Sequence, residues 1–183
     1  MSTLFVDTIN EKTTGNGIVI PGHVLQVKQT VFKDTFSTAI GPNFAEVTGL
    51  RCSITPKSTS SKILVRLSLV IASQYWQVRG RLLKDGTVID GALGNQRGSN
   101  RKRVSFNYIK YGGGSSTSLY DMAGMPVEYL DSPATTSSVE YSLDIGGYST
   151  SYTVYINRGH DDNDGTGYDG TPMSTMTLME IGG

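Results

Sequence analysis

The chain has 183 residues, enough for one domain with a core and a short extension but short for two. Its 16 basic and 16 acidic residues cancel, which argues against nucleic-acid binding because proteins of that class carry a basic excess. Helix formers are sparse, 22 glycines are present, and no long segment repeats apolar residues at three-to-four spacing, so strands are expected to form the fold.

The first 22 residues are predicted to be a short extended arm that ends at Pro21-Gly22. A polar stretch separates two small apolar groups, which cannot bury themselves and need the body of the domain or other chains as a partner. Their members are Leu4, Val6, Ile9, Ile18 and Ile20, with Val19 between the last two. No signal-peptide pattern and no apolar run of about 20 residues is present, so a soluble protein made in the cytosol, without membrane insertion, is expected.

Strand signals begin after the arm, at Val24 to Phe32 and at Leu50 to Thr55. Residues Ile63 to Ala72 are the clearest strand, because every second residue from Ile63 to Ile71 is a large aliphatic one. This pattern predicts a central strand with one fully apolar face. Cys52 is the one cysteine, so no intrachain disulfide is possible, and we expect it to be a core or near-core residue.

Asp85-Gly86 separates the runs Gln77 to Lys84 and Thr87 to Leu93 and predicts a hairpin, because both turn positions need positive φ. Later strands are expected around Phe106 and Tyr108, from Leu119 to Leu130, from Val139 to Ile145, around Val154, and from Ser174 to Ile181. Pro126 makes the second of these an edge or broken strand. Nine or ten strands predict one all-β domain over residues 23–183, a jelly-roll-like antiparallel β-sandwich.

Catalysis has little support in this sequence. His23 and His160 lie far apart, nothing pairs either with Cys52, and no nucleophile or phosphate-loop motif occurs. Gly165 to Gly170 matches the dinucleotide fingerprint, but it follows an acidic loop and precedes a strand, so loop flexibility explains the glycines better. A glycosidase would have to combine an aspartate of 161–164 with a distant carboxylate such as Asp121, Glu128 or Glu140. We therefore expect no enzyme and no cofactor.

Asp161, Asp162 and Asp164 form a weak calcium candidate, since Ca²⁺ prefers clustered oxygen ligands. The register of an EF-hand fails, because His160 and Thr171 occupy positions where Asp and Glu are expected. A solvated polar loop is the favoured interpretation, and no metal is expected.

Two sets of residues are candidates for contacts with a glycan or a protein partner. Arg97, Arg101 and Arg103, with Lys102, form a basic cluster suited to phosphate, to a sulfated or acidic glycan, or to the acidic loop of a neighbouring subunit. Tyr148 and Tyr168 lie in predicted loops, where aromatic faces can grip sugars, whereas Tyr152 is expected in the core of a strand.

Several segments resemble fibre-type virion proteins of tailed phages, particularly those of marine bacteria and cyanobacteria. The resemblance covers nearly the whole chain and is carried by residues 6–18, 54–65, 129–133, 153–158 and 177–181. It implies a trimeric β-sandwich of a head fibre, tail fibre or capsid decoration protein, located on the virion. The arm residues would then attach the chain to a major capsid or tail protein.

Two functions follow from this resemblance. The first is a homotrimeric capsid decoration, cement or head-fibre protein. The alternative is a tail-fibre module that recognises a host-surface glycan through loops 94–101 and 157–172.

Overall fold

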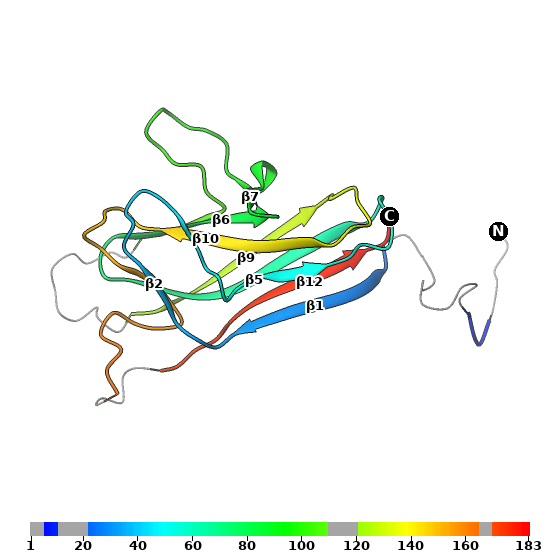
Figure 1. Cartoon of the computed structure of the whole chain (residues 1–183), viewed down its shortest axis with the longest axis horizontal. Coiled ribbons are helices and arrows are strands. Elements are labelled where there is room, and N and C mark those ends of the chain that lie inside the picture. The colour runs from blue at the N-terminus through cyan, green and yellow to red at the C-terminus, as the bar shows by residue number, and fades with distance from the viewer. Residues whose placement is uncertain (1–5, 11–21, 110–120, 165–169) are drawn as a thin grey trace.

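The computed structural model describes residues 6–10, 22–109, 121–164 and 170–183, whose strands form two antiparallel sheets packed on one another (Figure 1). The first sheet contains β1 (Val24–Phe32), β2 (Phe36–Thr38), β5 (Lys62–Ser73), β9 (Ala123–Asp131), β11 (Val154–Ile156) and β12 (Ser174–Ile181). The second contains β3 (Ala45–Glu46), β4 (Cys52–Ile54), β6 (Gln77–Lys84), β7 (Thr87–Val88), β8 (Phe106–Ile109) and β10 (Val139–Gly146). The predicted all-β sandwich is confirmed, while its jelly-roll connectivity stays a prediction.

Strand β5 is the centre of the first sheet. It pairs with β9 along one edge, and with β12 and then β11 along the other. The aliphatic side chains at alternate positions from Ile63 to Ile71 are all buried, as their spacing predicted. They pack against the inward face of β10, where Tyr141, Leu143 and Ile145 are fully buried. The core of the molecule therefore lies between these two strands and their neighbours.

The predicted hairpin at Asp85-Gly86 is confirmed, with φ of 49° and 74° at the two residues. Its second strand is shorter than expected and ends at Val88. A 3-10 turn over Asp90–Ala92 follows, and it is the one helical element among the described residues. Here the Ala92 N–H donates to the Ile89 carbonyl oxygen, so a local bond replaces the ladder that a strand through Leu93 would need. The chain then leaves the sheet as a long loop.

Other predictions were confirmed or corrected in detail. Cys52 is buried, and β12 has the predicted bounds. Strand β9 carries Pro126 and, within the described part of the chain, pairs only with β5, as expected of an edge strand. Tyr152 is not a core strand residue, because it precedes β11 and is only half-buried. Ser142 and Asp144, on the polar side of β10, are also buried, and the buried Asp144 carboxylate accepts hydrogen bonds from the Arg81 guanidinium on the paired strand β6.

The sandwich has two distinct ends. At one end the Gly22 N–H donates to the Gly182 carbonyl oxygen at 2.8 Å, so the chain enters beside its C-terminus (Figure 1). Twelve residues of β5 lead away from this end and span roughly 36 Å at a strand's rise per residue. The opposite end is formed by the β5–β6 turn and the β10–β11 loop. A hydrogen bond from the Gln74 N–H to the Thr153 carbonyl oxygen links this turn to this loop.

The structure describes residues 6–10 of the predicted arm, in which Val6 and Ile9 are exposed. Leu4, Ile18 and Ile20 lie outside the described residues. No helix in the described part of the chain has the length and apolarity that crossing a bilayer requires.

Candidate functional site: an aromatic end and a basic loop

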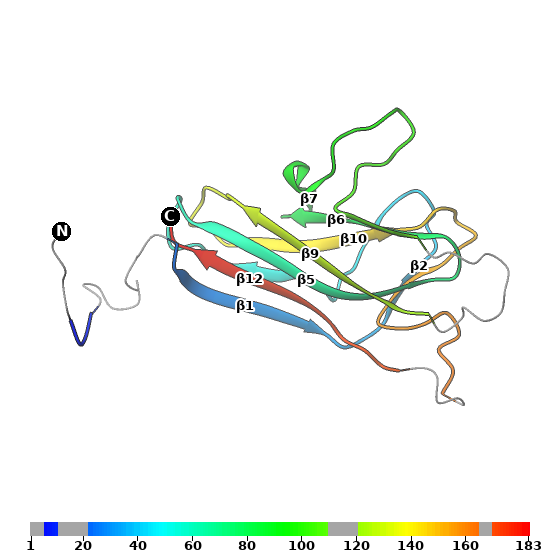
Figure 2. The same cartoon turned by 180° about the vertical axis from the view of Figure 1, so that it is seen from behind.

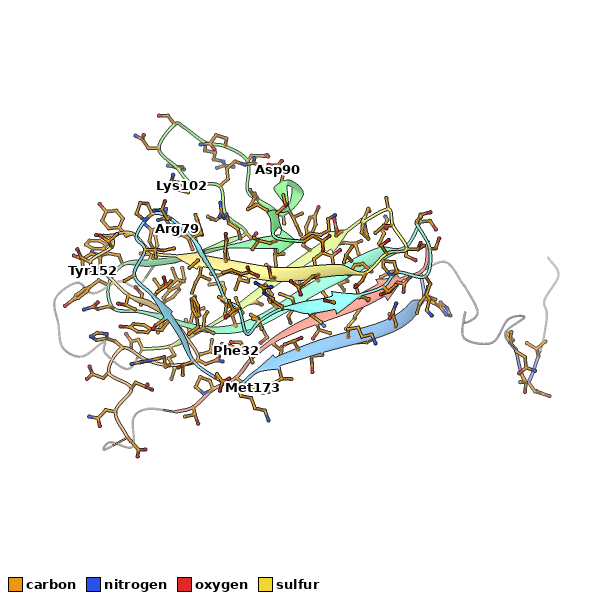
Figure 3. All side chains as sticks on the ribbon, viewed as in Figure 1. Phe32, Arg79, Asp90, Lys102, Tyr152 and Met173 are labelled. Atoms are coloured by element: carbon orange, nitrogen blue, oxygen red, sulfur yellow. The ribbon has the colours of Figure 1, made fainter. Side chains whose placement is uncertain are left out.

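Four aromatic residues gather at the end of the sandwich that lies away from the termini, where Figure 3 labels Tyr152. The ring centroids of Tyr75 and Tyr152 are 5.1 Å apart, and those of Trp76 and Tyr148 are 6.2 Å apart. Trp76 is 53% exposed and Tyr148 59%, although side chains of this size usually bury most of their surface. We call these four residues the aromatic end.

The backbone beneath the aromatic end is held by buried polar groups. The Ser73 hydroxyl donates to the Tyr75 carbonyl oxygen at 2.6 Å. On the facing loop the buried Arg79 guanidinium donates to the carbonyl oxygen of Gly147, the residue before Tyr148. Burial also lowers the pKa of Arg79. The rings are thus presented on two braced loops, an arrangement suited to stacking against the C–H face of a sugar ring while the tyrosine hydroxyls stay wet.

Trp76 occupies a strained backbone conformation. Its φ is +67°, in the left-handed region where a residue with a Cβ costs roughly 1 kcal/mol relative to glycine. Strain of this kind persists where the surrounding structure imposes it, and it clusters at binding sites.

We expect Trp76→Gly to be more stable than Trp76→Ala by about 1 kcal/mol in urea unfolding, because both lose the ring but only glycine relieves the strain. Because both variants lose the same ring contacts, the difference between their free energies of unfolding reports the backbone strain at residue 76. Equal stabilities would mean that residue 76 is not held at positive φ in solution.

The predicted basic cluster lies on the loop between the 3-10 turn and β8, which projects from the second sheet (Figure 1). Arg103 is anchored there. It donates to the Asp90 carboxylate at 2.6 Å and to the Gly94 carbonyl oxygen at 2.9 Å. The hydrogen bond and charge of Arg103 hold the pKa of Asp90 below its ordinary value. Arg97, Arg101 and Lys102 form no ion pair with any described residue.

The candidates from the sequence are therefore only partly brought together. Arg97, Arg101 and Arg103 share one loop, but Tyr148 is at the aromatic end and Tyr168 lies outside the described residues. Tyr75 and Trp76 were missed, although two adjacent aromatic residues between two predicted strands are a signal of an exposed hairpin tip.

The acidic loop shows no metal site in the part of the chain that is described, where no three His, Cys, Asp or Glu side chains are grouped to hold an ion. Asp162 instead lies 3.3 Å from the Arg158 guanidinium. Glu128 and Glu140, suggested as glycosidase carboxylates, form ion pairs with Arg66 and Arg51.

Two of the candidate catalytic residues have defined surroundings: His160 contacts a tyrosine hydroxyl, and Cys52 is buried. His160 Nδ1 lies 2.7 Å from the Tyr155 hydroxyl, and burial raises the pKa of the Cys52 thiol, which disfavours a reactive thiolate.

The sequence matches no protein-family model and no curated protein, so the function has to be inferred from the residues themselves.

Proposed function

We propose that this chain is a homotrimeric structural protein on the surface of a tailed-phage particle, acting as a capsid decoration, cement or head-fibre protein. In this role the N-terminal arm attaches the chain to a major capsid or tail protein, and the β-sandwich faces outward.

The observation that carries this proposal is the two-ended layout of the sandwich. The chain enters at the end where Gly22 is bonded to Gly182, and the aromatic end lies at the other end of β5. An appendage needs this separation, because its anchor and its contact surface must be engaged at the same time. Val6 and Ile9, apolar and exposed in the arm, are suited to the anchoring contact.

Self-association is supported by the outer face of the first sheet, whose strands β1, β12, β5 and β9 lie side by side in Figure 2. The strand register places one residue from each of them in a continuous apolar row, which consists of Val27, Met179, Leu64 and Leu130. Val27 and Leu130 are exposed. The neighbouring polar row contains Arg66 and Glu128, which carry opposite charges. When two copies of the chain bring these faces together, Arg66 of one copy can therefore lie against Glu128 of the other.

We expect Leu130→Arg to convert the trimer to a monomer in light scattering, because it places a charge in the apolar contact. Ile109→Arg is the matched control: Ile109 is 51% exposed and Leu130 46%, but Ile109 lies on β8 of the other sheet. A wild-type monomer, or a Leu130→Arg trimer, would contradict the assignment of this face.

The proposal as a whole is tested by gold-labelled antibody on intact particles in electron microscopy. Label over the head is the expected result and supports a decoration or head-fibre role. Label confined to the tail would favour the second function below, and particles without label would refute a virion role.

The second function is that of a tail-fibre module that recognises a host-surface glycan. The observation that favours it is the aromatic end, where Trp76 and Tyr148 are exposed on braced loops.

A further inference from the structure

The projecting loop encloses a groove that the proposed virion role does not use. One wall is the basic loop and the other is the turn at residues 42–44, with Arg81 of β6 between them. The groove has a volume of about 940 Å³, the size of a ligand pocket and several times that of a single phosphate ion. We name it the basic groove; its main lining residues are Asn43, Phe44, Arg81, Arg101, Lys102 and Arg103.

The charge of the basic groove is of one sign. Four of its lining residues are cationic, and no carboxylate lies among the described residues that line it. Arg81 and Arg103 are committed to Asp144 and Asp90 respectively. Arg101 and Lys102, on the projecting loop where Figure 3 labels Lys102, have no acidic partner among the described residues.

Among the surface arginines, this lack of an acidic partner in the described part of the chain is confined to the projecting loop. Of the eight arginines in the chain, five form ion pairs with described residues and Arg79 is buried. The remaining two, Arg97 and Arg101, both lie on this loop. Arg97, Arg101 and Lys102, which have no acidic partner among the described residues, repel one another, a cost that an anionic ligand would relieve.

The backbone of the loop is braced, so the segment that carries Arg101 and Lys102 is held beside the groove. The Gln96 side-chain amide donates to the Arg101 carbonyl oxygen at 3.0 Å, and the Gly94 N–H donates to the Val104 carbonyl oxygen at 3.2 Å. Arg103 ties the base of the loop to Asp90 and Gly94. A loop whose backbone is already ordered loses less conformational freedom when a ligand binds, which favours tighter binding.

The apolar lining indicates which kind of anion fits. Pro42, Phe44 and Leu93 line the same groove, and the Phe44 ring is fixed by the Arg81 guanidinium 3.8 Å from its centroid. A sugar ring offers C–H faces to such residues and hydroxyls to the Asn43 amide. Nucleic acid fits less well, because the zero net charge of the chain gives no wider basic surface along a phosphate backbone.

We propose that the basic groove binds an acidic oligosaccharide, whose sulfates or uronate carboxylates pair with Arg101 and Lys102 while a sugar ring packs against Phe44. The site is separate from the aromatic end and does not depend on the chain being part of a particle.

The test is isothermal titration calorimetry on the full chain with four probes. These are a sulfated hexasaccharide prepared from heparin, a hexauronate prepared from alginate, neutral maltohexaose and a single-stranded hexadeoxynucleotide. We expect one acidic hexasaccharide to bind with micromolar Kd, and maltohexaose to bind at least about tenfold more weakly. Sulfate and carboxylate recognition are told apart by which of the two acidic probes binds.

The double variant Arg101→Gln and Lys102→Gln should weaken that binding about tenfold or more, since it removes the two cations lining the groove that have no acidic partner among the described residues. The Gln96 bond to the Arg101 backbone is kept, so the loop should stay in place. The matched control replaces the exposed Lys28 and Lys33 by glutamine and removes the same charge elsewhere. An equal loss in the control, no binding of either acidic probe, or tighter binding of the deoxynucleotide would each overturn the proposal.

Discussion

Replacing Glu180 by alanine is expected to lower the free energy of unfolding by about 3 kcal/mol, although no catalytic or binding role involves this residue. Glu180 is completely buried on β12, and its carboxylate accepts hydrogen bonds from the Gln26 side chain and the Lys57 backbone N–H, each at 2.6 Å. Charge-assisted bonds of this kind contribute roughly 1.5–3 kcal/mol each, and alanine would remove both acceptors.

The expected loss corresponds to a fall in Tm of about 6–12 °C for a domain of this size, measured by calorimetry at neutral pH. Glu128→Ala is the matched control, because Glu128 lies in the same sheet with its side chain 56% exposed and pairs with Arg66 at 2.6 Å. That exposed pair should contribute about 0.5 kcal/mol or less. Equal losses in the two variants would show that the buried carboxylate adds nothing beyond a surface charge.

Glu180 also illustrates where prediction from the sequence ends. The sequence predicted a strand from Ser174 to Ile181, and in the folded chain Met176 and Leu178 are buried on its inward side. Glu180 lies on the same inward side of the strand as Met176 and Leu178. It can be buried because Gln26 and Lys57, more than a hundred residues away in sequence, supply donors. No local pattern contains that pairing.

The secondary-structure elements that the sequence predicted correctly are those determined by residues close to one another in the chain. The aliphatic side of β5 and the positive φ values at Asp85-Gly86 are of this type, since period two and turn geometry act within a few residues. The two-residue strand β3 was missed, because so short a strand exists only through its pairing with β10.

The candidate sites follow the same distinction between residues that are close in sequence and residues that the fold brings together. The cluster Arg97 to Arg103 is contiguous in sequence and was found there. The opposite wall of the basic groove is at Phe44 and its floor is at Arg81. Both come from other parts of the chain, so the sequence did not predict them as part of a site. Tyr148 was found as a loop residue and Trp76 had a local signal that was missed, but the contact between their rings depends on two loops meeting at the same end of the sandwich.

Deleting residues 1–21 is expected to abolish attachment to the particle while leaving the sandwich folded, and it has the largest functional effect of the changes considered. A starting methionine before Gly22 keeps that residue in place beside Gly182. Strand β1 begins at Val24, after the deletion, and pairs with β12 from Val24 to Phe32. The core residues all lie between Phe32 and Leu178, so the deletion removes none of them.

The measurement is co-sedimentation of purified protein with particles that lack it, alongside circular dichroism and thermal unfolding of the same samples. Full-length chain should sediment with the particles, and the truncated chain should stay in the supernatant with a Tm within a few degrees of full length. A double variant, Val6→Ser and Ile9→Ser, changes two exposed arm residues without shortening the chain and should weaken sedimentation in the same direction. If the truncated chain unfolds, the arm belongs to the folded core and the boundary at residue 22 is wrong. If it remains folded and still sediments, attachment lies on the sandwich, and the apolar row at Val27 and Leu130 becomes the surface to change next.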